Sequence, residues 1–169
     1  RGRLMARRSG RSSGGTPATV ALERAGVAFA LHAYEHDPRA ASFGLEAAEA
    51  LGLDPTRVFK TLMVSLDGRL VVGIVPVTGQ LDLKALARVL GGSKAVMAEA
   101  AAAERATGFV VGGISPVGQK RAHPTVLDES ATGFPTVFVS AGRRGLDLEV
   151  APADLVEVTG ATLAAISRP

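Results

Sequence analysis

The sequence predicts one domain with a mixed α+β fold (mixed α/β), in which a curled, barrel-like mixed β-sheet is surrounded by helices. Short apolar runs rich in Val, Ile and Leu recur along the chain, separated by Gly, Pro and Asp residues, as is typical of short strands. Four or five helical stretches lie among these runs without alternating strictly with them, which argues against a doubly wound sheet. With 169 residues, 47% of them hydrophobic, the chain can build one core of its own.

The first third of the chain is expected to form two helices on either side of an extended segment. Thr16 followed by Pro17 is a typical helix start, because the hydroxyl can cap the first turn and proline fits the first helical position. That helix should end at Gly26, where glycine can leave the helical conformation. The alternating residues 27–34 should then be extended, and a second helix should cover residues 42–52.

A central hairpin is predicted from the apolar residues 57–64 and 70–75, with the typical two-residue turn Asp67-Gly68 between them. The first run is apolar almost throughout, as in a strand buried on at least one face, but Lys60 interrupts it. A lysine buried in a strand costs several kcal/mol unless it is paired. We therefore expect Lys60 to meet an anion or a polarised carbonyl at the mouth of a pocket, and the alternative is a lysine on the solvent face of the strand.

The rest of the chain continues the mixture of short strands and helices. Helices are expected over residues 81–90, over residues 99–106 and from Pro152 onward. Further strands are expected over residues 94–97, 109–111, 125–127, 136–140 and 146–150, and residues 161–166 should form a final strand or helix.

The charge of the chain is divided between a basic start and a weakly acidic body. Residues 1–15 hold five arginines and no acid, so the other residues contain 14 basic and 16 acidic side chains. We expect residues 1–15 to be a disordered basic tail and residues 16–169 to be the folded domain. Met5 is a candidate native start, in which case residues 1–4 are an addition. A basic arm of this kind can add affinity for nucleic acid, and the alternative is a solvated terminus without a role.

The composition excludes several classes of protein. No apolar run is long enough to span a membrane, and the basic start lacks the apolar segment of a secretory signal, so a cytoplasmic protein is expected. The absence of cysteine excludes disulfides, thiolate metal sites and a cysteine nucleophile. We expect no membrane partner and no cofactor.

Two motifs resemble known sites but lack essential residues. His32 and His36 are four residues apart, but the segment is extended and Ala33 occupies the position of the metalloprotease glutamate, so we expect no metal site. Residues 113–120 have the glycine spacing of a phosphate-binding loop without its Lys-Ser/Thr pair, which argues against a nucleoside triphosphatase. No Ser-His-Asp set is convincing either.

Two glycine-containing segments are better candidates for ligand binding. Gly112-Gly113 follows a predicted strand, where glycine lets the backbone approach a ligand closely or adopt positive φ. Arg143-Arg144, between small residues after another strand, suits an anionic ligand. The alternatives are a plain tight turn and a charged turn.

Taken together, the motifs resemble the Cys-tRNA(Pro) deacylases of the YbaK/EbsC family, which are free-standing relatives of the editing domain inserted in bacterial prolyl-tRNA synthetase. The resemblance covers residues 16–169, and Phe-Lys-Thr followed by Gly-Gly-Ile-Ser-Pro is its most specific part. The segments that carry the resemblance are Thr16 to Thr19, Tyr34 with His36-Asp37, Ser42 to Gly44, Val58 to Leu62, Leu81 to Ala87, Thr107 to Phe109, Gly112 to Pro116, and Ser140 to Gly145.

The resemblance implies a set of site residues. Lys60 matches the family's key lysine, which is thought to engage the end of the tRNA, and Gly112 matches a glycine whose backbone faces the aminoacyl ester. We therefore expect these two residues to be catalytic. The residues expected to bind the substrate are Tyr34, Phe43, Thr61, Gly113, Ser140 and Asp147.

The implied activity is the hydrolysis of mischarged Cys-tRNA(Pro), and of Cys-tRNA(Cys) as a further substrate, by attack of the cysteinyl thiol on its own ester. The implied partners are the acceptor end of tRNA(Pro) and prolyl-tRNA synthetase. A local basic patch of Lys60, Lys120, Arg121, Arg143 and Arg144 is expected to contact the tRNA. The alternatives are a deacylase for Ala-tRNA(Pro) or for serine or threonine esters that uses water, and a non-catalytic adaptor that binds tRNA or a synthetase.

Overall fold

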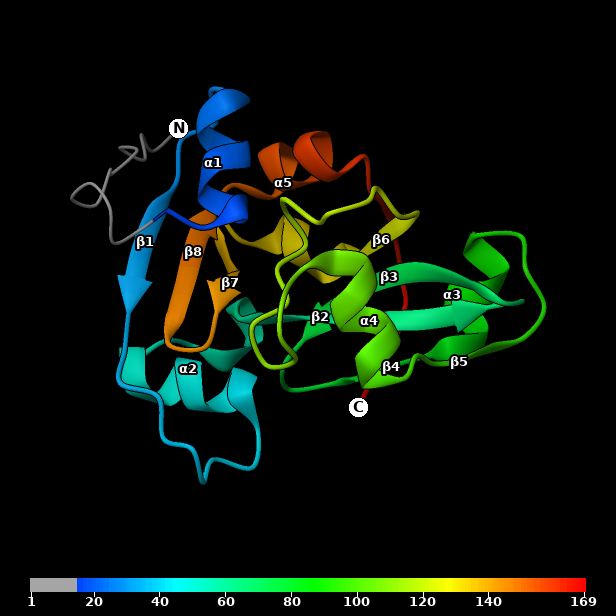
Figure 1. Ribbon diagram of the computed structural model, residues 1–169, viewed down its shortest axis with the longest axis horizontal. Coiled ribbons are helices and arrows are strands. Elements are labelled where there is room, and N and C mark those ends of the chain that lie inside the picture. Colours follow the sequence, from blue (N-terminus) through cyan, green and yellow to red (C-terminus); the bar gives the residue numbers. More distant parts are fainter. Residues whose placement is uncertain (1–14) are drawn as a thin grey trace.

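The computed structural model describes residues 15–169, so the tail predicted for residues 1–15 lies almost entirely outside the described residues. Five α-helices and two short 3₁₀-helices are distributed along the described part (Figure 1). The helices are α1 (Pro17–Arg24), α2 (Phe43–Leu51), α3 (Leu83–Val89), α4 (Ala100–Thr107) and α5 (Pro152–Thr159), with the 3₁₀-helices η1 (Pro55–Arg57) and η2 (Glu129–Gly133). No helix within residues 15–169 is both long and apolar enough to cross a membrane.

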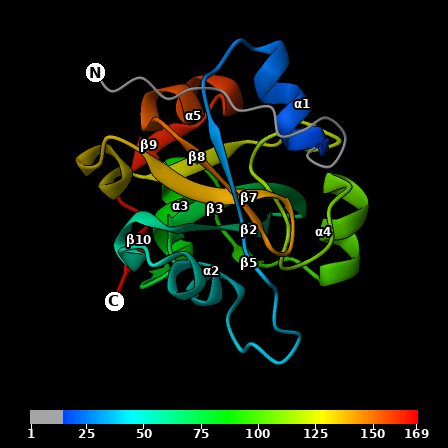
Figure 2. The ribbon, with the colours of Figure 1, turned by 90° about the vertical axis from the view of Figure 1, so that its left-hand side faces the viewer.

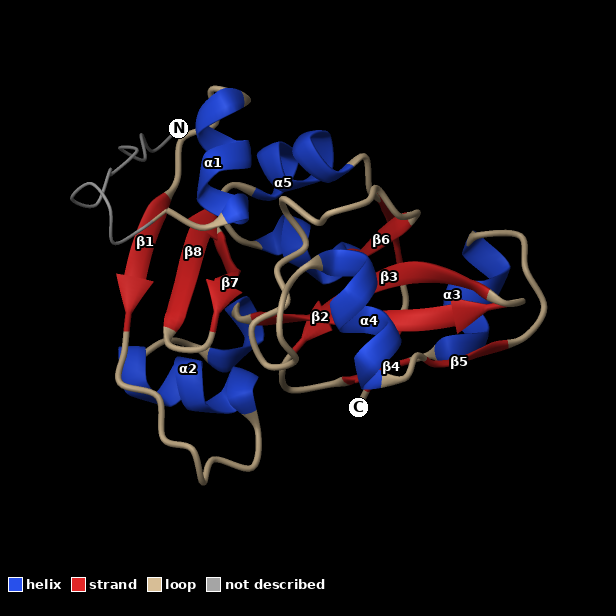
Figure 3. Ribbon diagram, viewed as in Figure 1, coloured by secondary structure: helices blue, strands red, loops and turns tan. Residues whose placement is uncertain are grey.

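The strands form three sheets (Figure 3). The strands are β1 (Ala30–Ala33), β2 (Phe59–Leu66), β3 (Arg69–Pro76), β4 (Gln80–Leu81), β5 (Ala95–Met97), β6 (Thr125–Asp128), β7 (Val137–Arg143), β8 (Leu146–Val150), β9 (Thr162–Ala164) and β10 (Ser167–Arg168). A five-stranded sheet has the order β5-β2-β3-β6-β9, with parallel pairs at β3–β6 and β6–β9 and antiparallel pairs elsewhere. A three-stranded antiparallel sheet has the order β1-β8-β7, and β4 pairs with β10.

The mixed α+β architecture in one domain is confirmed, but the sheet does not close into a barrel. The two larger sheets are joined by a single parallel bridge between Val58, just before β2, and Phe138 in β7. Beyond that bridge β2 pairs with β3 and β5, whereas β7 pairs with β8, so the two sheets diverge. The barrel-like expectation was therefore wrong in this detail, because continuity between the sheets depends on one residue pair.

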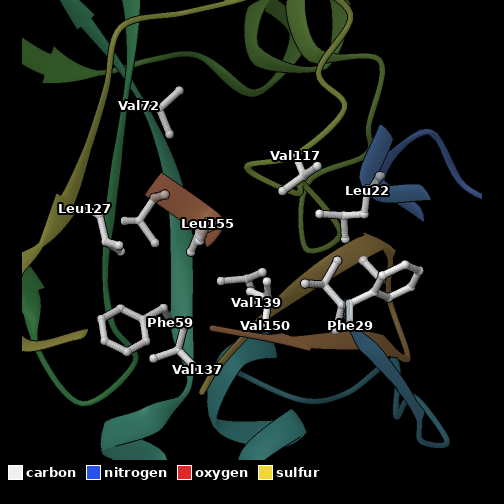
Figure 4. Close-up of a cluster of buried hydrophobic side chains, with 14 of the residues drawn as sticks. Leu22, Phe29, Phe59, Val72, Val117, Leu127, Val137, Val139, Val150 and Leu155 are labelled. Carbon is white, nitrogen blue, oxygen red and sulfur yellow. The ribbon is translucent and has the colours of Figure 1, made fainter. Parts of the chain in front are cut away.

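The main core lies where the two larger sheets, α1 and α5 meet (Figure 4). Leu22 of α1, Phe59 of β2 and Leu155 of α5 point into it, and each exposes at most 3% of its surface. The alternating Val137 and Val139 of β7 are fully buried there, as expected for the inner face of a strand. Burial of a side chain of this size contributes about 1.5–3 kcal/mol, so this cluster fixes how the sheets are placed relative to each other.

Local sequence signals set most helix and turn boundaries as predicted. The Thr16 hydroxyl accepts the Thr19 N–H and Pro17 occupies the first turn of α1, while Ser42 caps α2. Asp67 and Gly68 both have positive φ, 51° and 89°, which makes the β2–β3 connection the predicted tight hairpin. Residues 161–166, for which the sequence predicts either a strand or a helix, contain the strand β9.

The strand predicted over residues 109–111 is absent. Phe109 is buried, Val110 is 59% exposed, and the Gly113 N–H donates to the Val110 carbonyl at 2.8 Å. The three apolar residues therefore lead into a tight turn, because no neighbouring strand is in place to pair with them. This turn carries Gly112, which has φ +91°.

Candidate functional site

One cavity of about 340 Å³ lies between the two larger sheets and is bordered by α2, α4 and the turn at Gly112. Figures 1 and 2 show β2 between α2 and α4, which places the start of the strand near both helices. Seven of the eight predicted site residues line the cavity, namely Tyr34, Phe43, Lys60, Thr61, Gly112, Ser140 and Asp147. The eighth, Gly113, is buried behind the wall rather than in it.

Lys60 lies near the start of β2, opposite Val75 in the β2–β3 hairpin. Its side chain is half-buried, and this burial lowers the pKa of the ammonium group because charge is less stable away from water. No carboxylate among residues 15–169 forms an ion pair with it. A partly desolvated cation at a cavity without a protein counter-ion is suited to bind an anionic group of a ligand.

Thr61 follows Lys60 and also lines the cavity. Its hydroxyl oxygen is the only buried side-chain nitrogen or oxygen without a hydrogen-bond partner in the described part of the chain. Leaving a buried polar group unsatisfied costs about 1–3 kcal/mol. An unpaired hydroxyl beside a cavity is therefore available to hydrogen-bond a ligand there.

Ser140 and Asp147 are directly opposite each other in the β7–β8 pair, so the strand register brings them to the same wall. Asp147 is only 6% exposed, and burial raises its pKa from the ordinary 3.8 to about 7. The Ser140 hydroxyl accepts the Gly142 N–H at 3.1 Å, at the β-bulge that follows. The cavity thus contains a carboxyl group able to exchange a proton near neutral pH.

Two aromatic side chains complete the wall. Burial and the nearby Asp147 carboxylate raise the pKa of Tyr34 to about 12, so its phenol is neutral at physiological pH. Phe43 begins α2, and the Arg144 guanidinium carbon lies 4.8 Å from the centre of its ring. Together these rings give the cavity an apolar side that faces the polar groups of β2, β7 and β8.

The backbone at Gly112 strongly favours glycine. A Cβ atom there would come within 2.6 Å of Arg144 Nε and 3.0 Å of the Phe43 ring, in addition to the strain of φ +91°. At Gly113 a Cβ atom would lie 2.7 Å from the Arg143 Cα, so the turn at Gly112 packs directly against the backbone at the end of β7. Close backbone packing therefore requires glycine at position 113, whereas at position 112 positive φ and the side chains of Arg144 and Phe43 favour it. This packing brings one peptide group to the cavity wall.

The expected basic patch is only partly assembled at the cavity. Lys60 lines the cavity, and Arg144 borders it through its contact with Phe43. Lys120 and Arg121 are exposed and belong to the loop after the Gly112 turn, where the Lys120 N–H donates to the Thr107 carbonyl at the end of α4. These two residues do not line the cavity.

His32 and His36 do not line the cavity, although the His36 ring packs against Phe43, with the ring centres 5.8 Å apart. His32 Nε2 lies 2.9 Å from Glu149 Oε1, and His36 Nδ1 lies 3.0 Å from Glu46 Oε1, so each contacts a different carboxylate. Among residues 15–169 no group of three His, Cys, Asp or Glu side chains is arranged to hold a metal ion.

Sequence reasoning missed Glu104, whose carboxylate accepts the Val111 N–H at 2.8 Å and so supports the Gly112 turn from α4. It also missed Met63 and Met97, which line the cavity. No motif marks these residues, because their proximity to the site depends on how α4 and β5 pack against β2. The arginine pair that includes Arg144 predicted an anionic ligand, but nothing in the sequence predicted the contact of Arg144 with Phe43.

Comparison with known proteins connects this geometry to one family. The model of the family described as the aminoacyl-tRNA editing domain matches residues 37–158. EbsC of Enterococcus faecalis, which its name describes provisionally as a Cys-tRNA(Pro)/Cys-tRNA(Cys) deacylase, is 40% identical over 121 residues, or 71% of this chain and 74% of the relative.

Solved structures agree over nearly the whole described fold. A crystal structure of a candidate trans-editing enzyme for prolyl tRNA synthetase has a TM-score of 0.79 at 27% identity and covers 94% of this chain and 99% of that one. A crystal structure of a hypothetical protein has a TM-score of 0.81 at 27% identity and covers 90% of this chain and 100% of that one.

Proposed function

This chain belongs to the aminoacyl-tRNA editing domain family and is an aminoacyl-tRNA deacylase, and from that premise we propose that its substrate is cysteine esterified to the 3′ end of tRNA(Pro). Cys-tRNA(Cys), which the name of the E. faecalis relative includes, is a further substrate. The enzyme acts in trans, beside prolyl-tRNA synthetase and in the cytoplasm where tRNA is charged. Editing is needed because a binding pocket discriminates poorly between side chains of similar size, such as those of cysteine and proline.

The composition of the cavity wall is the observation that carries this proposal. The sequence has no cysteine, and no histidine lines the cavity of the described chain. No imidazole of the described residues lines the cavity, and neither the Thr61 nor the Ser140 hydroxyl is hydrogen-bonded to the Lys60 amine, so neither is paired with a base of the kind that activates such nucleophiles. A substrate that brings its own thiol removes the need for a nucleophile on the enzyme.

The proposed step is an intramolecular acyl transfer. The Asp147 carboxylate accepts the proton of the cysteinyl thiol, and the sulfur attacks the ester carbonyl carbon. The bond between that carbon and the ribose O3′ then breaks, and O3′ takes up the proton. The products are a cyclic cysteine thiolactone, which water opens to cysteine, and tRNA with a free 3′ hydroxyl. A base with a pKa near 7 suits the thiol, whose own pKa is about 8.5.

The other lining residues orient the ester and stabilise its charge. The Lys60 ammonium group binds a phosphate at the end of the tRNA, and the unpaired Thr61 hydroxyl bonds a polar atom of the substrate. The Gly112 N–H donates to the carbonyl oxygen as negative charge develops on it. Tyr34 and Phe43 confine the side chain, and holding reacting atoms in place can lower a barrier by about 7–11 kcal/mol.

A second candidate function uses the same carboxylate. Asp147, protonating near neutral pH, could equally take a proton from water, which would then attack an alanyl, seryl or threonyl ester. The cavity of about 340 Å³ admits any of these side chains. The two functions differ in whether the substrate thiol is essential.

A deacylation panel separates these functions. Purified protein is incubated with tRNA(Pro) carrying cysteine, S-methylcysteine, serine, alanine or proline, and the loss of each ester is followed beside an uncatalysed control. We expect Cys-tRNA(Pro) to be cleaved at least about 100-fold faster than the seryl ester, because a thiol is far more acidic and nucleophilic than a hydroxyl.

Two variants accompany the panel. Lys60→Ala should lose most activity towards Cys-tRNA(Pro) without loss of folding, since Lys60 is not part of the main core. Asp147→Asn should lose activity as well, because the amide cannot accept the thiol proton. Equal rates on the cysteinyl and seryl esters, or on the cysteinyl and S-methylcysteinyl esters, would refute thiol assistance. Bound tRNA without cleavage of any ester would favour an adaptor.

A further inference from the structure

The turn that carries Gly112 has three successive backbone N–H groups, and two of them are occupied. The Val111 N–H donates to Glu104 Oε2 at 2.8 Å, and the Gly113 N–H donates to the Val110 carbonyl at 2.8 Å. The Gly112 N–H between them has no partner among residues 15–169, although Gly112 lines the cavity. A backbone N–H group that lines a cavity and has no protein partner can donate to a ligand there, because backbone N–H groups are strong hydrogen-bond donors.

The carbonyl of the same peptide group is held by an arginine. Arg144 donates from Nε and Nη2 to the Val111 oxygen, at 3.0 and 2.6 Å. The guanidinium also lies over the Phe43 ring, 4.8 Å from its centre. Arg144 is exposed, so these contacts are not a by-product of core packing. Two N–H donors and an aromatic face fix a side chain that would otherwise be mobile in solvent.

The Val111 carbonyl and the Gly112 N–H belong to one planar peptide unit, and in a trans peptide they point in opposite directions. Fixing the oxygen on the Arg144 side therefore fixes the direction of the N–H away from Arg144. A cationic donor on the carbonyl also polarises the peptide and makes its N–H a stronger donor. Glu104 holds the preceding peptide unit through the Val111 N–H, so the turn is fixed on both sides.

We propose that Arg144 and Glu104 are positioning residues that orient the Val111–Gly112 peptide, so that the Gly112 N–H donates to the substrate's ester carbonyl oxygen. The inference rests on the proposed function, because it assigns that N–H to the developing oxyanion of the aminoacyl ester. It adds two side chains that act on the ester through the peptide unit and do not react themselves. Their effect should appear in kcat rather than in KM, because the oxyanion forms only after binding.

The test uses two pairs of variants on the full chain. Arg144→Ala removes both donors to the Val111 oxygen, and Arg144→Lys restores at most a point charge without the planar stack on Phe43. Glu104→Ala removes the acceptor for the Val111 N–H, whereas Glu104→Gln keeps a carbonyl oxygen at the same place. Arg105→Ala, an exposed residue of α4 next in sequence to Glu104, controls for the loss of a positive charge.

We expect kcat for Cys-tRNA(Pro) to fall about 10- to 100-fold in Arg144→Ala and Glu104→Ala, somewhat less than for complete removal of an oxyanion donor. KM should change less than about threefold, and Glu104→Gln and Arg105→Ala should stay close to wild type. Added guanidinium ion, at concentrations far below those that unfold proteins, should restore part of the activity of Arg144→Ala only. A purely structural role would not give this rescue.

A measurement on the free protein keeps the inference separate from the proposed function. The amide resonance of Gly112 in a ¹⁵N–¹H spectrum should shift in Arg144→Ala and Glu104→Ala and remain in place in Arg105→Ala. An unchanged Gly112 resonance, or unchanged kcat in active Arg144→Ala and Glu104→Ala variants, would overturn the inference. Failure of the wild-type protein to cleave any ester would overturn the proposed function, and the resonance would still decide the role of Arg144.

Discussion

Asp147 combines burial, a position on the cavity wall and a proton that is exchanged near neutral pH. The carboxyl group is 6% exposed, and its pKa is raised to about 7 by burial. A group whose pKa is higher in the folded than in the unfolded state favours folding when protonated. The contribution of the protonated Asp147 to the free energy of unfolding is therefore complete below pH 4 and is lost as the pH rises through about 7. At pH 8 the carboxyl group is ionised, and its burial destabilises the folded protein.

Asp147→Asn should therefore stabilise the protein at high pH. The amide has the shape of the protonated acid and never ionises, so the variant should gain up to roughly 4 kcal/mol over wild type at pH 8 and little at pH 4. Thermal unfolding of both proteins at the two pH values measures this difference. An Asp147→Asn variant that is less stable than wild type at pH 8 would contradict this prediction. It would mean that hydrogen bonds or nearby positive charge stabilise the Asp147 carboxylate by more than burial destabilises it.

The sequence predicts the position at the cavity for some site residues and not for others. Lys60 and Gly112 could be predicted because a lysine in an apolar strand and paired glycines after apolar residues are locally unusual. Asp147 was found through resemblance, since nothing in residues 146–150 shows that the carboxylate will be buried. Glu104 was missed, because its bond to Val111 is made only after α4 and the following turn have packed together.

At the scale of elements, α1 is connected to the site through its N-cap residue, Thr16. The Thr16 side chain caps α1 and donates to the Ala141 carbonyl of β7 at 2.6 Å, next to the bulge after Ser140. A Cβ atom at Gly142 would lie 3.2 Å from the Thr16 Cβ, so helix and bulge are in close contact. The cap therefore also holds the strand that presents Ser140 to the cavity.

Thr16→Ala should lower the free energy of unfolding by about 1–3 kcal/mol, because it removes a helix cap and leaves the buried Ala141 carbonyl without its donor. Thr16→Ser, which keeps the hydroxyl, should recover most of that loss. Urea denaturation of the three proteins measures both effects. A Thr16→Ser variant as unstable as Thr16→Ala would assign the loss to the methyl group and its packing instead.

Elements were predicted well where their signals are local. The caps of α1 and α2, the Asp67-Gly68 hairpin and the glycines at helix ends depend on neighbouring residues only. The predicted strand at residues 109–111 failed because an apolar triplet becomes a strand only when a partner strand is beside it. The same limit applies to the sheet, whose closure depends on residues far apart in the sequence, such as Val58 and Phe138.

At the scale of the whole molecule, charge sets how the protein meets its substrate. Residues 16–169 contain 14 basic and 16 acidic side chains, and only part of the expected basic patch borders the cavity. Because non-specific affinity for nucleic acid comes from contacts to phosphates, tRNA binding by the described domain should be weak and only slightly dependent on salt. A partner that already holds the tRNA would supply the missing affinity.

Addition of prolyl-tRNA synthetase should therefore accelerate the deacylation of Cys-tRNA(Pro) at limiting enzyme concentration, by raising the local concentration of substrate. Initial rates with and without the synthetase, at two ionic strengths, measure the effect. A synthetase for another amino acid is the control and should not accelerate the reaction. Equal rates with and without prolyl-tRNA synthetase would argue that the enzyme collects its substrate from solution unaided.

The two larger sheets are joined by one backbone pair, Val58 with Phe138, and this junction lies beside the cavity. The walls on the two sides of this junction belong to separately hydrogen-bonded sheets, and the placement of one sheet against the other depends on the packing of the main core rather than on backbone pairing. We therefore expect core substitutions next to this junction to change the width of the cavity while the hydrogen-bonded geometry within each sheet is kept.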